Sequence, residues 1–256
     1  MNLNFERMWD IFYEQFVTEG GYRNVLLGLR NTLIIAIFGL IIGIVIGTIV
    51  ATVQIAGRRN VVVKIFAVIG DVYTSVFRGT PIIVQLLIFH YIIFAGVDVD
   101  GLLDTAIYGA FGESAIYNMV GRLPLESVIV FGLNSGAYVA EIMRGGILSV
   151  DIGQTEAGRT LGLSYTTTMF RVVYPQAIKN VVPTLGNELI ALTKDTSVAG
   201  YVATMDLTRA FRLIASAKYE YIIPYLMLAL AYLVIIIIFT VIIRLVERRL
   251  RKSERR

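Results

Sequence analysis

Long apolar stretches separated by short polar segments dominate this sequence. The stretch Asn31–Ile55 carries no charged residue, and it exceeds the length of about 20 apolar residues that a helix needs to cross a bilayer. Because only helices and closed barrels satisfy the backbone inside lipid, the pattern predicts an all-α integral membrane protein with about five transmembrane helices. We expect residues 1–256 to form a single transmembrane domain whose spans are about 31–55, 79–96, 126–148, 181–202 and 221–245.

The apolar region 61–96 is interrupted at Arg78-Gly79-Thr80-Pro81. Proline disfavours helical geometry at the residue that precedes it, so we expect a helix to break at Thr80. We interpret 61–77 as a cytoplasmic or interfacial lead-in and 79–96 as the crossing. Hydropathy alone also permits six crossings.

Charge between the spans predicts their orientation. The turn at 57–60, the loop 149–180 and the C-terminal tail are rich in Lys and Arg, whereas 97–123 is acidic. Basic loops stay in the cytoplasm. We therefore expect a multi-pass protein with the N-terminus outside and the C-terminus in the cytoplasm, and with 97–123 as an extracytoplasmic insertion.

Glycines recur every four residues in two of the predicted spans, which places them on one face of each helix. Small residues let neighbouring membrane helices approach closely, although glycine is common in membrane helices generally. We expect helix packing at Gly39, Gly43, Gly47, Gly132 and Gly136.

Composition narrows the class further. Hydrophobic residues make up 56% of the chain and charged residues only 16%, against about 25% charged in soluble domains, and the mean hydropathy is +0.72. The absence of cysteine excludes disulfides and thiolate metal sites, and the single histidine excludes a histidine-rich metal site. The net charge of +4 lies at membrane edges, so we expect contact with membrane lipid and no nucleic acid partner. From the cysteine and histidine counts we expect no metal. The first 24 residues lack the apolar core of a cleavable signal peptide.

The loop 149–180 carries a spaced pattern. Glu156-Ala157-Gly158, then Gly162, then Val172 and Pro175 follow E-A-A-x3-G-x9-I-x-L-P, with substitutions at the third position and in the distal half. In this loop the chain resembles the permease subunits of bacterial binding-protein-dependent ABC importers. The segments RGTPIIVQLL (78–87), LNSGAYVAEIMRGGI (133–147), GLSYTTTMFRVVYPQA (162–177) and LGNELIALTKDTSVAG (185–200) are similar to the polar amino acid subfamily. The insertion 97–123 looks longer than that family's outer loop.

The resemblance implies a type I ABC importer-like permease bundle in the bacterial cytoplasmic (inner) membrane. It implies two ABC ATPase subunits, an extracytoplasmic solute-binding protein, and a second permease, either a copy or a similar chain. The sequence contains no phosphate-binding G-x4-G-K-[ST] motif, so we expect a subunit that is not an enzyme, binds no cofactor and leaves ATP and Mg to the partner ATPase. The ATPase-coupling loop would then use Glu156, Ala157, Gly158, Gly162 and Pro175. We expect a tight turn at Gly162, because glycine tolerates a positive φ. Without the resemblance, the loop also fits an amphipathic helix at the membrane surface.

Polar residues inside the predicted spans are candidates for a substrate pathway, because such residues usually face the bundle interior or water. The candidates are Gln85, His90, Asn134, Tyr138, Asn187 and Glu188. His90 also fits a packing role, and Lys194 is an alternative partner that would neutralise Glu188. Glu141 and Arg144 are three residues apart and can pair on one helix face.

Two other classes of protein remain possible at this stage. An ion-gradient-driven secondary amino acid transporter often shows inverted repeats and broken helices, and no repeat is visible in this chain. A membrane scaffold or sensor would need a recognisable soluble domain or a long tail. Uptake that depends on ATP, or co-purification with an ATPase, separates the permease from both.

Overall fold

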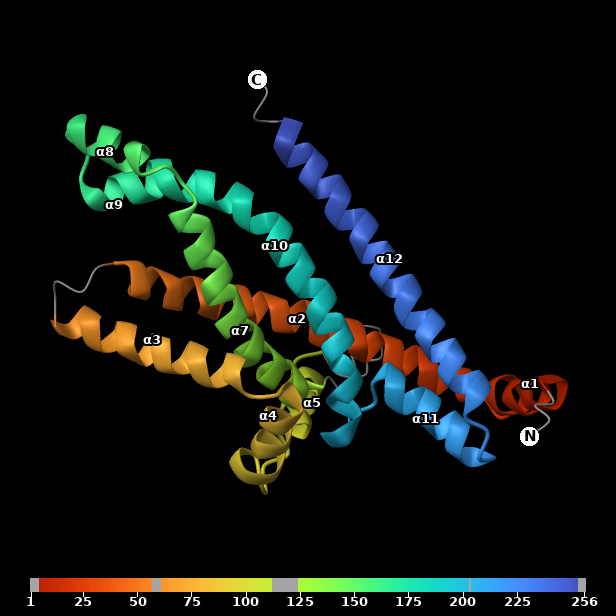
Figure 1. Ribbon diagram of the computed structural model, residues 1–256. Coiled ribbons are helices and arrows are strands. Elements are labelled where there is room, and N and C mark those ends of the chain that lie inside the picture. Colours follow the sequence, from red (N-terminus) through yellow and green to blue (C-terminus); the bar gives the residue numbers. More distant parts are fainter. Residues whose placement is uncertain (1–4, 57–60, 112–123, 203, 253–256) are drawn as a thin grey trace. The chain divides into compact units, whose positions relative to one another are not determined.

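The computed structural model describes residues 5–56, 61–111, 124–202 and 204–252, and within these ranges the chain is helical and has no strand (Figure 1). The described helices are α1 (Phe5–Tyr13), α2 (Gly21–Ile55), α3 (Val61–Gly79), α4 (Ile82–Ile88), α5 (Val99–Phe111), α7 (Leu125–Leu148), α8 (Ile152–Thr160), α9 (Tyr165–Thr168), α10 (Tyr174–Asp195), α11 (Leu207–Ala217) and α12 (Ile222–Lys252). Three π-helical turns, η1 (Glu14–Thr18), η2 (Phe89–Ile93) and η3 (Met169–Val173), and the 3₁₀ helix η4 (Thr196–Val202) complete the helical segments. The all-α prediction is confirmed.

Length and composition single out few of these helices as membrane spans. In the described part of the chain, Gly21–Ile55 and Ile222–Arg249 each pass as a span, and the bent pair Val61–Gly79 and Ile82–Ile93 adds a third if it is one span. Helices α7 and α10 contain charged residues, among them Glu141, Arg144 and Glu188, which lowers their hydropathy. The five predicted crossings therefore stay a prediction.

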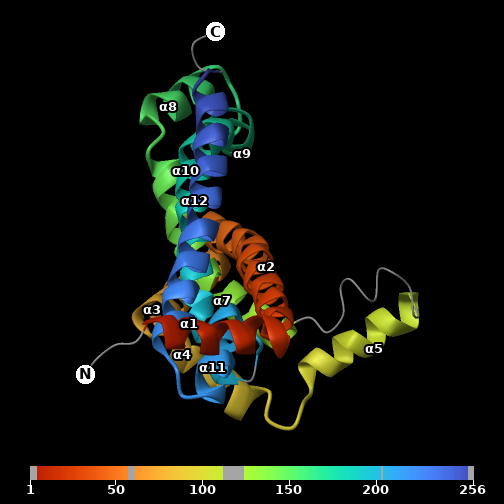
Figure 2. The ribbon, with the colours of Figure 1, turned by 90° about the vertical axis from the view of Figure 1, so that its right-hand side faces the viewer.

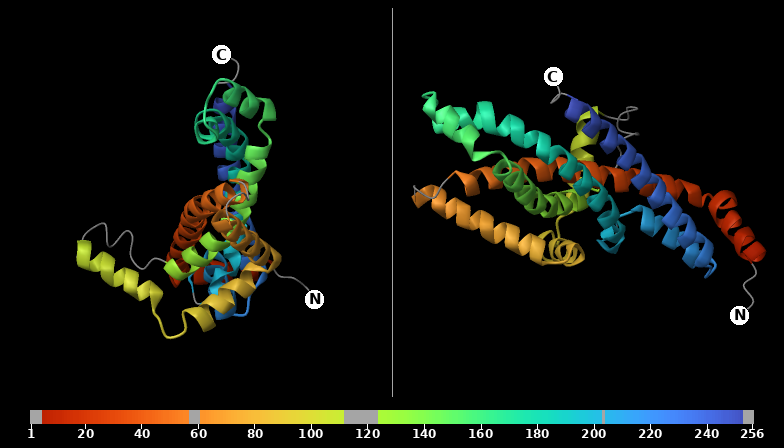
Figure 3. Two further views of the ribbon diagram at one scale, coloured as in Figure 1. Left: turned by 90° about the vertical axis from the view of Figure 1, so that its left-hand side faces the viewer. Right: turned by 45° about the horizontal axis from the view of Figure 1, so that its top comes forward.

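The predicted helix break before Pro81 is confirmed. Helix α3 ends at Gly79, Pro81 adopts an extended conformation with φ −62° and ψ 138°, and the two helices meet at 107°. The segment that the sequence suggested as a lead-in is a continuous helix, and α3 lies along the second half of α2 (Figures 1 and 3). Gln54 Nε2 of α2 donates to Asp71 Oδ1 of α3 at 3.0 Å.

The contacts divide the chain into two compact units. Unit 1 comprises 1–39, 81–131 and 192–237, and unit 2 comprises 40–80, 132–191 and 238–256. Helices α2, α7, α10 and α12 each contribute residues to both units, so neither unit is one continuous segment.

Close glycine contacts hold α2 against α7 in unit 2. A Cβ atom at Gly43 would lie 2.7 Å from Ser135 Oγ, and one at Gly47 would lie 2.7 Å from the backbone nitrogen of Ala140. From the other side, a Cβ at Gly132 would meet Ile42, and one at Gly136 would meet Ile46 and Tyr73. Gly39 lies on the preceding turn of α2, in unit 1.

Unit 1 contains a helix that the sequence did not predict. Residues 203–220 read as mixed polar, but α11 buries one apolar face, with Leu207, Phe211 and Ile214 among its buried residues. Its N-terminus is capped by Asp206, whose carboxylate accepts hydrogen bonds from the backbone nitrogens of Thr208 and Arg209, each at 3.0 Å. Burial raises the pKa of Asp206, and these hydrogen bonds oppose the shift.

The insertion 97–123 is described as far as Phe111, and it is helical. Figure 2 shows α5 extending away from the other helices of unit 1. The remainder of the insertion, the basic turn at 57–60 and the last residues of the basic tail lie outside the described residues.

Candidate functional site

The loop 149–180 folds as two short helices joined by a tight turn. Helix α8 begins at Asp151, whose Oδ1 accepts from Gly153 N at 2.7 Å, and ends in a Schellman motif. In that motif Leu163 N donates to Gly158 O at 3.1 Å and Gly162 N donates to Arg159 O at 3.0 Å. Gly162 has φ +79°, a conformation that glycine adopts without the steric penalty of a Cβ. The predicted tight turn at Gly162 is confirmed.

Gly158 lets α8 lie directly on the next turn of the loop. It is buried, and a Cβ there would lie 2.6 Å from Thr168 Cγ2. Beneath this contact, Met169 and Val173 pack with Ile147 of α7 and Ala177 of α10 in one hydrophobic cluster. The loop is therefore attached to both helices that flank it in sequence.

The other side of α8 is open. Glu156 and Ala157 are exposed, and so are Ile152 at 74% and Leu161 at 81%. Pro175, in the first turn of α10, is also exposed. Large exposed apolar side chains beside a carboxylate form a surface suited to a protein partner.

The candidate pathway residues of unit 2 lie on α7 and α10. Ser135 Oγ of α7 donates to Glu188 Oε1 of α10 at 3.0 Å. Asn134 is buried and its Nδ2 donates to Phe77 O at 3.3 Å, whereas Asn187 is exposed. Ser135 and Glu188 thus form a polar strip across two helices of one unit, next to Asn134 on α7.

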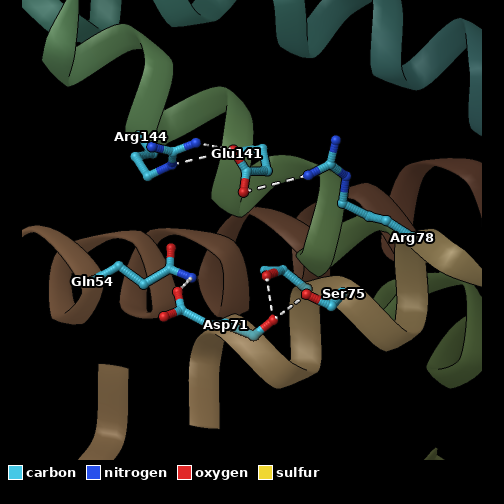
Figure 4. A network of polar contacts seen from close by, with 7 residues as sticks. Gln54, Asp71, Ser75, Arg78, Glu141 and Arg144 are labelled. Atoms are coloured by element: carbon cyan, nitrogen blue, oxygen red, sulfur yellow. Dashed lines mark hydrogen bonds and ion pairs between the residues drawn. The ribbon is translucent and has the colours of Figure 1, made fainter. Parts of the chain in front are cut away.

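A second polar network connects α3 with α7, as Figure 4 shows. Arg144 Nη2 and Arg78 Nη1 approach the two carboxylate oxygens of Glu141, at 2.7 and 3.3 Å respectively. The guanidinium of Arg78 also lies 5.6 Å from the centroid of the Tyr138 ring. The expected pair of Glu141 and Arg144 is confirmed, and Arg78 is a third member that the sequence did not indicate.

In unit 1, Gln85 is buried on α4 and His90 lies in η2. His90 Nδ1 lies 2.9 Å from Glu126 Oε1, so the lone histidine has a carboxylate partner. The backbone nitrogen of Glu126 in turn donates to Asp100 Oδ1 at 2.9 Å. Burial raises the pKa of Asp100, and the hydrogen bond from Glu126 opposes that shift.

A cavity of about 1020 Å³ lies beside Asp100 in unit 1. Arg30 and Asn31 of α2, Thr204, and acidic residues of the insertion line it. The polar groups of the insertion therefore face the start of α2. Among the described residues, no group of three or more His, Cys, Asp or Glu side chains could hold a metal ion.

Sequence reasoning missed three partners in these networks: Ser135, Arg78 and Glu126. Each is separated from its partner by tens of residues, so local spacing carries no signal for the pairing. Ser135 follows the candidate Asn134, and Arg78 opens the RGTP segment, which are the only hints that the sequence offers.

Comparison with known proteins places the chain in a family. Residues 43–252 match the family model described as "Binding-protein-dependent transport system inner membrane component". A putative glutamine transport system permease protein of Rickettsia bellii is 34% identical over 92% of this chain and 93% of its own. An arginine transport system permease protein of Bacillus subtilis is 34% identical over 90% and 94% of the two chains.

Among solved structures, the crystal structure of an amino acid ABC transporter with histidines superposes with a TM-score of 0.72 at 31% identity. The match covers 97% of this chain and 100% of that one.

Proposed function

The chain belongs to the family of binding-protein-dependent transport system inner membrane components, and from this premise we propose that its loop 149–180 couples amino acid transport to an ATPase. It is a permease subunit of an amino acid ABC transport system. Membership of this family excludes both alternative classes, the secondary transporter and the membrane scaffold or sensor.

Polar amino acids are the proposed substrates. Support comes from relatives named for glutamine and arginine transport. An amino acid presents an ammonium and a carboxylate, and Asn134 and Asn187 offer both donors and acceptors. The carboxylate of Glu188 adds negative charge, which favours a cationic amino acid. Tyr138, Gln85 and His90 complete the proposed pathway.

The remaining subunits follow from the same premise. Two ABC ATPase subunits carry ATP and Mg, a second permease completes the pathway, and an extracytoplasmic binding protein delivers the substrate. This chain contributes no ATP site. Transport proceeds by alternating access as the ATPase dimer closes and the loop moves.

The observation that carries the coupling proposal is the direct path from α8 to the polar strip. Helix α8 presents Glu156 and packs through Gly158 on Thr168 of α9. Helix α9 continues through η3 into α10, which carries Glu188. A displacement of α8 therefore acts on α10 without passing through a flexible linker.

The sharpest test changes only the backbone preference at Gly162. No atom lies within 4 Å of a Cβ at this position, so Gly162→Val disfavours the positive φ without a clash, whereas Gly162→Asn tolerates it. We expect G162V to insert normally but lose most substrate-stimulated ATP hydrolysis in proteoliposomes, and G162N to retain it. Equal hydrolysis in both variants would show that the turn does not transmit the coupling.

A charge test addresses the docking surface. Glu156→Lys reverses an exposed charge without removing a packing contact, and Glu156→Gln is its matched control. E156K should reduce co-purification of the ATPase much more than E156Q. If both variants retain the ATPase, Glu156 lies outside the contact.

Selectivity is tested at Glu188. Uptake of arginine and glutamine is compared for the wild type and Glu188→Gln at matched expression. Arginine uptake should fall more than glutamine uptake. An unchanged ratio would place selectivity with the binding protein or with other residues.

The proposed orientation has the N-terminus outside and the C-terminus in the cytoplasm. A tag within 97–123 should be accessible only from outside, and a C-terminal tag only from inside. Finding both on one side would exclude five crossings.

A further inference from the structure

One face of α1 packs against neighbouring residues of unit 1. Phe12 is only 4% exposed and stacks on Phe16 with ring centroids 5.2 Å apart. Just beyond the helix, a Cβ at Gly21 would lie 2.6 Å from Gln15 O and 3.2 Å from Ile214 Cγ1 of α11. The N-terminal helix is thus a packed part of the unit.

A second face of α1 carries exposed aromatic side chains. Phe5, Trp9 and Tyr13 recur every four residues and are 54%, 48% and 54% exposed. Residues at this spacing lie above one another on a helix. Val17, in η1, is also exposed. The three rings therefore form an aromatic stripe (Phe5, Trp9, Tyr13).

A third face is acidic. Glu6, Asp10 and Glu14 each follow a residue of the aromatic stripe and are exposed. Going round the helix, the order is the buried face, the aromatic stripe and then the carboxylates. A helix with an apolar side next to a charged side is typical of segments that lie in a membrane interface.

The lipid-facing surface of α2 begins next to α1. Helix α2 is long and apolar enough to cross a membrane, and Leu26 and Phe38 on it are 60% and 51% exposed. Gly20, with φ +77°, separates it from the N-terminal segment. In Figure 2, α1 runs across the view, whereas the start of α12, also in unit 1, rises through it.

We propose that α1 is an interfacial anchor whose aromatic stripe inserts at the boundary between lipid headgroups and acyl chains, in the leaflet where α2 begins. Tryptophan and tyrosine favour this depth because their rings are apolar and their N–H and O–H groups reach water. The acidic face stays in the aqueous layer. The segment exposes three carboxylates and one guanidinium, that of Arg7. Its net charge is therefore negative, anionic lipid adds no attraction, and the contact is apolar.

The chain provides its own probe, because Trp9 is its only tryptophan. The full chain is placed in nanodiscs of phosphatidylcholine, and its fluorescence is quenched either by aqueous acrylamide or by lipids brominated at a shallow or a deep acyl position. In a Trp9→Phe background, Ile41→Trp on α2 supplies a deep reporter. Leu161→Trp supplies an aqueous reporter, because Leu161 is 81% exposed in the turn after α8, within the loop assigned to the cytoplasm.

We expect Trp9 to be quenched more by shallow than by deep bromine and to be several-fold less accessible to acrylamide than the L161W reporter. Replacing a third of the lipid by phosphatidylglycerol should leave both results unchanged. Two results would overturn the proposal. Accessibility equal to that of L161W would mean that the aromatic stripe lies in water. Protection from both acrylamide and bromine would mean that protein, such as a second permease, covers it.

Discussion

Two contacts in unit 2 hold their helices together in opposite ways. Helices α2 and α7 meet where side chains are missing, at Gly43, Gly47 and Gly132. In contrast, α3 and α7 are joined by the long side chains of Arg78 and Glu141. In lipid, apolar burial adds little between helices, so association depends on close packing and hydrogen bonds. A glycine contact brings rigid backbone into the interface, while a polar pair can adjust its rotamers. The glycine contact should therefore tolerate substitution far less than the polar pair does.

The largest effect is expected at Gly47. A Cβ there would lie 2.7 Å from the backbone nitrogen of Ala140, and backbone cannot move aside. Gly47→Leu should destabilise the protein by about 3 kcal/mol or more, measured by thermal unfolding in detergent. The matched control is Gly145→Leu on α7, because no atom lies within 4 Å of a Cβ at that position. A similar loss of stability in G47L and G145L would contradict the idea that the glycine contact is specifically intolerant of added side chains.

The buried cap at Asp206 comes next. Asp206→Ala removes acceptors for two backbone N–H groups at the start of α11 and should destabilise by about 2 kcal/mol. Asp206→Asn keeps one acceptor oxygen and should lose much less. Equal losses would mean that the charge of Asp206, rather than its cap, stabilises the helix.

The same carboxylate gives a pH dependence. Burial raises the pKa of Asp206 above its ordinary value of 3.8, so the folded state holds the proton more tightly than the unfolded chain. The stability that this protonation contributes is complete below pH 3.8 and is lost as the pH rises through the raised pKa. The D206N variant cannot titrate there, so the stability of the wild type relative to D206N should fall with rising pH in that window.

A smaller effect is expected from Ser135→Ala. The hydroxyl is fully buried and donates to Glu188, so its removal should destabilise by about 1 kcal/mol. The control Ser75→Ala removes an exposed hydroxyl that bonds only within α3 and should change stability by less than about 0.5 kcal/mol. An effect of S135A no larger than that of S75A would indicate that Glu188 does not need this donor.

The smallest effect is expected at the network between α3 and α7. The side chains of Arg78 and Arg144 are 42% and 45% exposed, so solvent screens their pairing with Glu141. Glu141→Gln should destabilise by about 0.5 kcal/mol, and less at high salt. A double-mutant cycle with Arg78→Gln isolates the pair. A coupling energy above about 2 kcal/mol would mean that this polar contact tolerates substitution as poorly as the glycine contact does.

The glycine contacts and the Gly162 turn could be predicted because each is encoded locally. A four-residue spacing identifies a helix face, a proline identifies the break at Pro81, and an isolated glycine after α8 identifies a positive φ. Such features need no knowledge of the partner helix.

The polar pairs between different helices and the short amphipathic helices could not be predicted in this way. Arg78 and Glu141 meet only after α3 and α7 have packed, so no spacing encodes their pairing. Helix α11 mixes charged and apolar residues over few turns, which a hydropathy profile averages away. A hydropathy profile misses α1 for the same reason, because its acidic residues lower the average hydropathy of the segment that carries the aromatic stripe.

The π-helical turn η3, between α9 and α10, has a consequence for insertions and deletions. A π turn accommodates one residue more than an α-helical turn, and each residue of an α-helix advances the azimuth by about 100°. Deleting one residue within Met169–Val173 would allow a regular helix to run from α9 into α10 while rotating α8 about that axis by roughly this angle. Loops of related chains with different lengths at this point would therefore present their docking faces in different directions, even if every residue of the motif were identical.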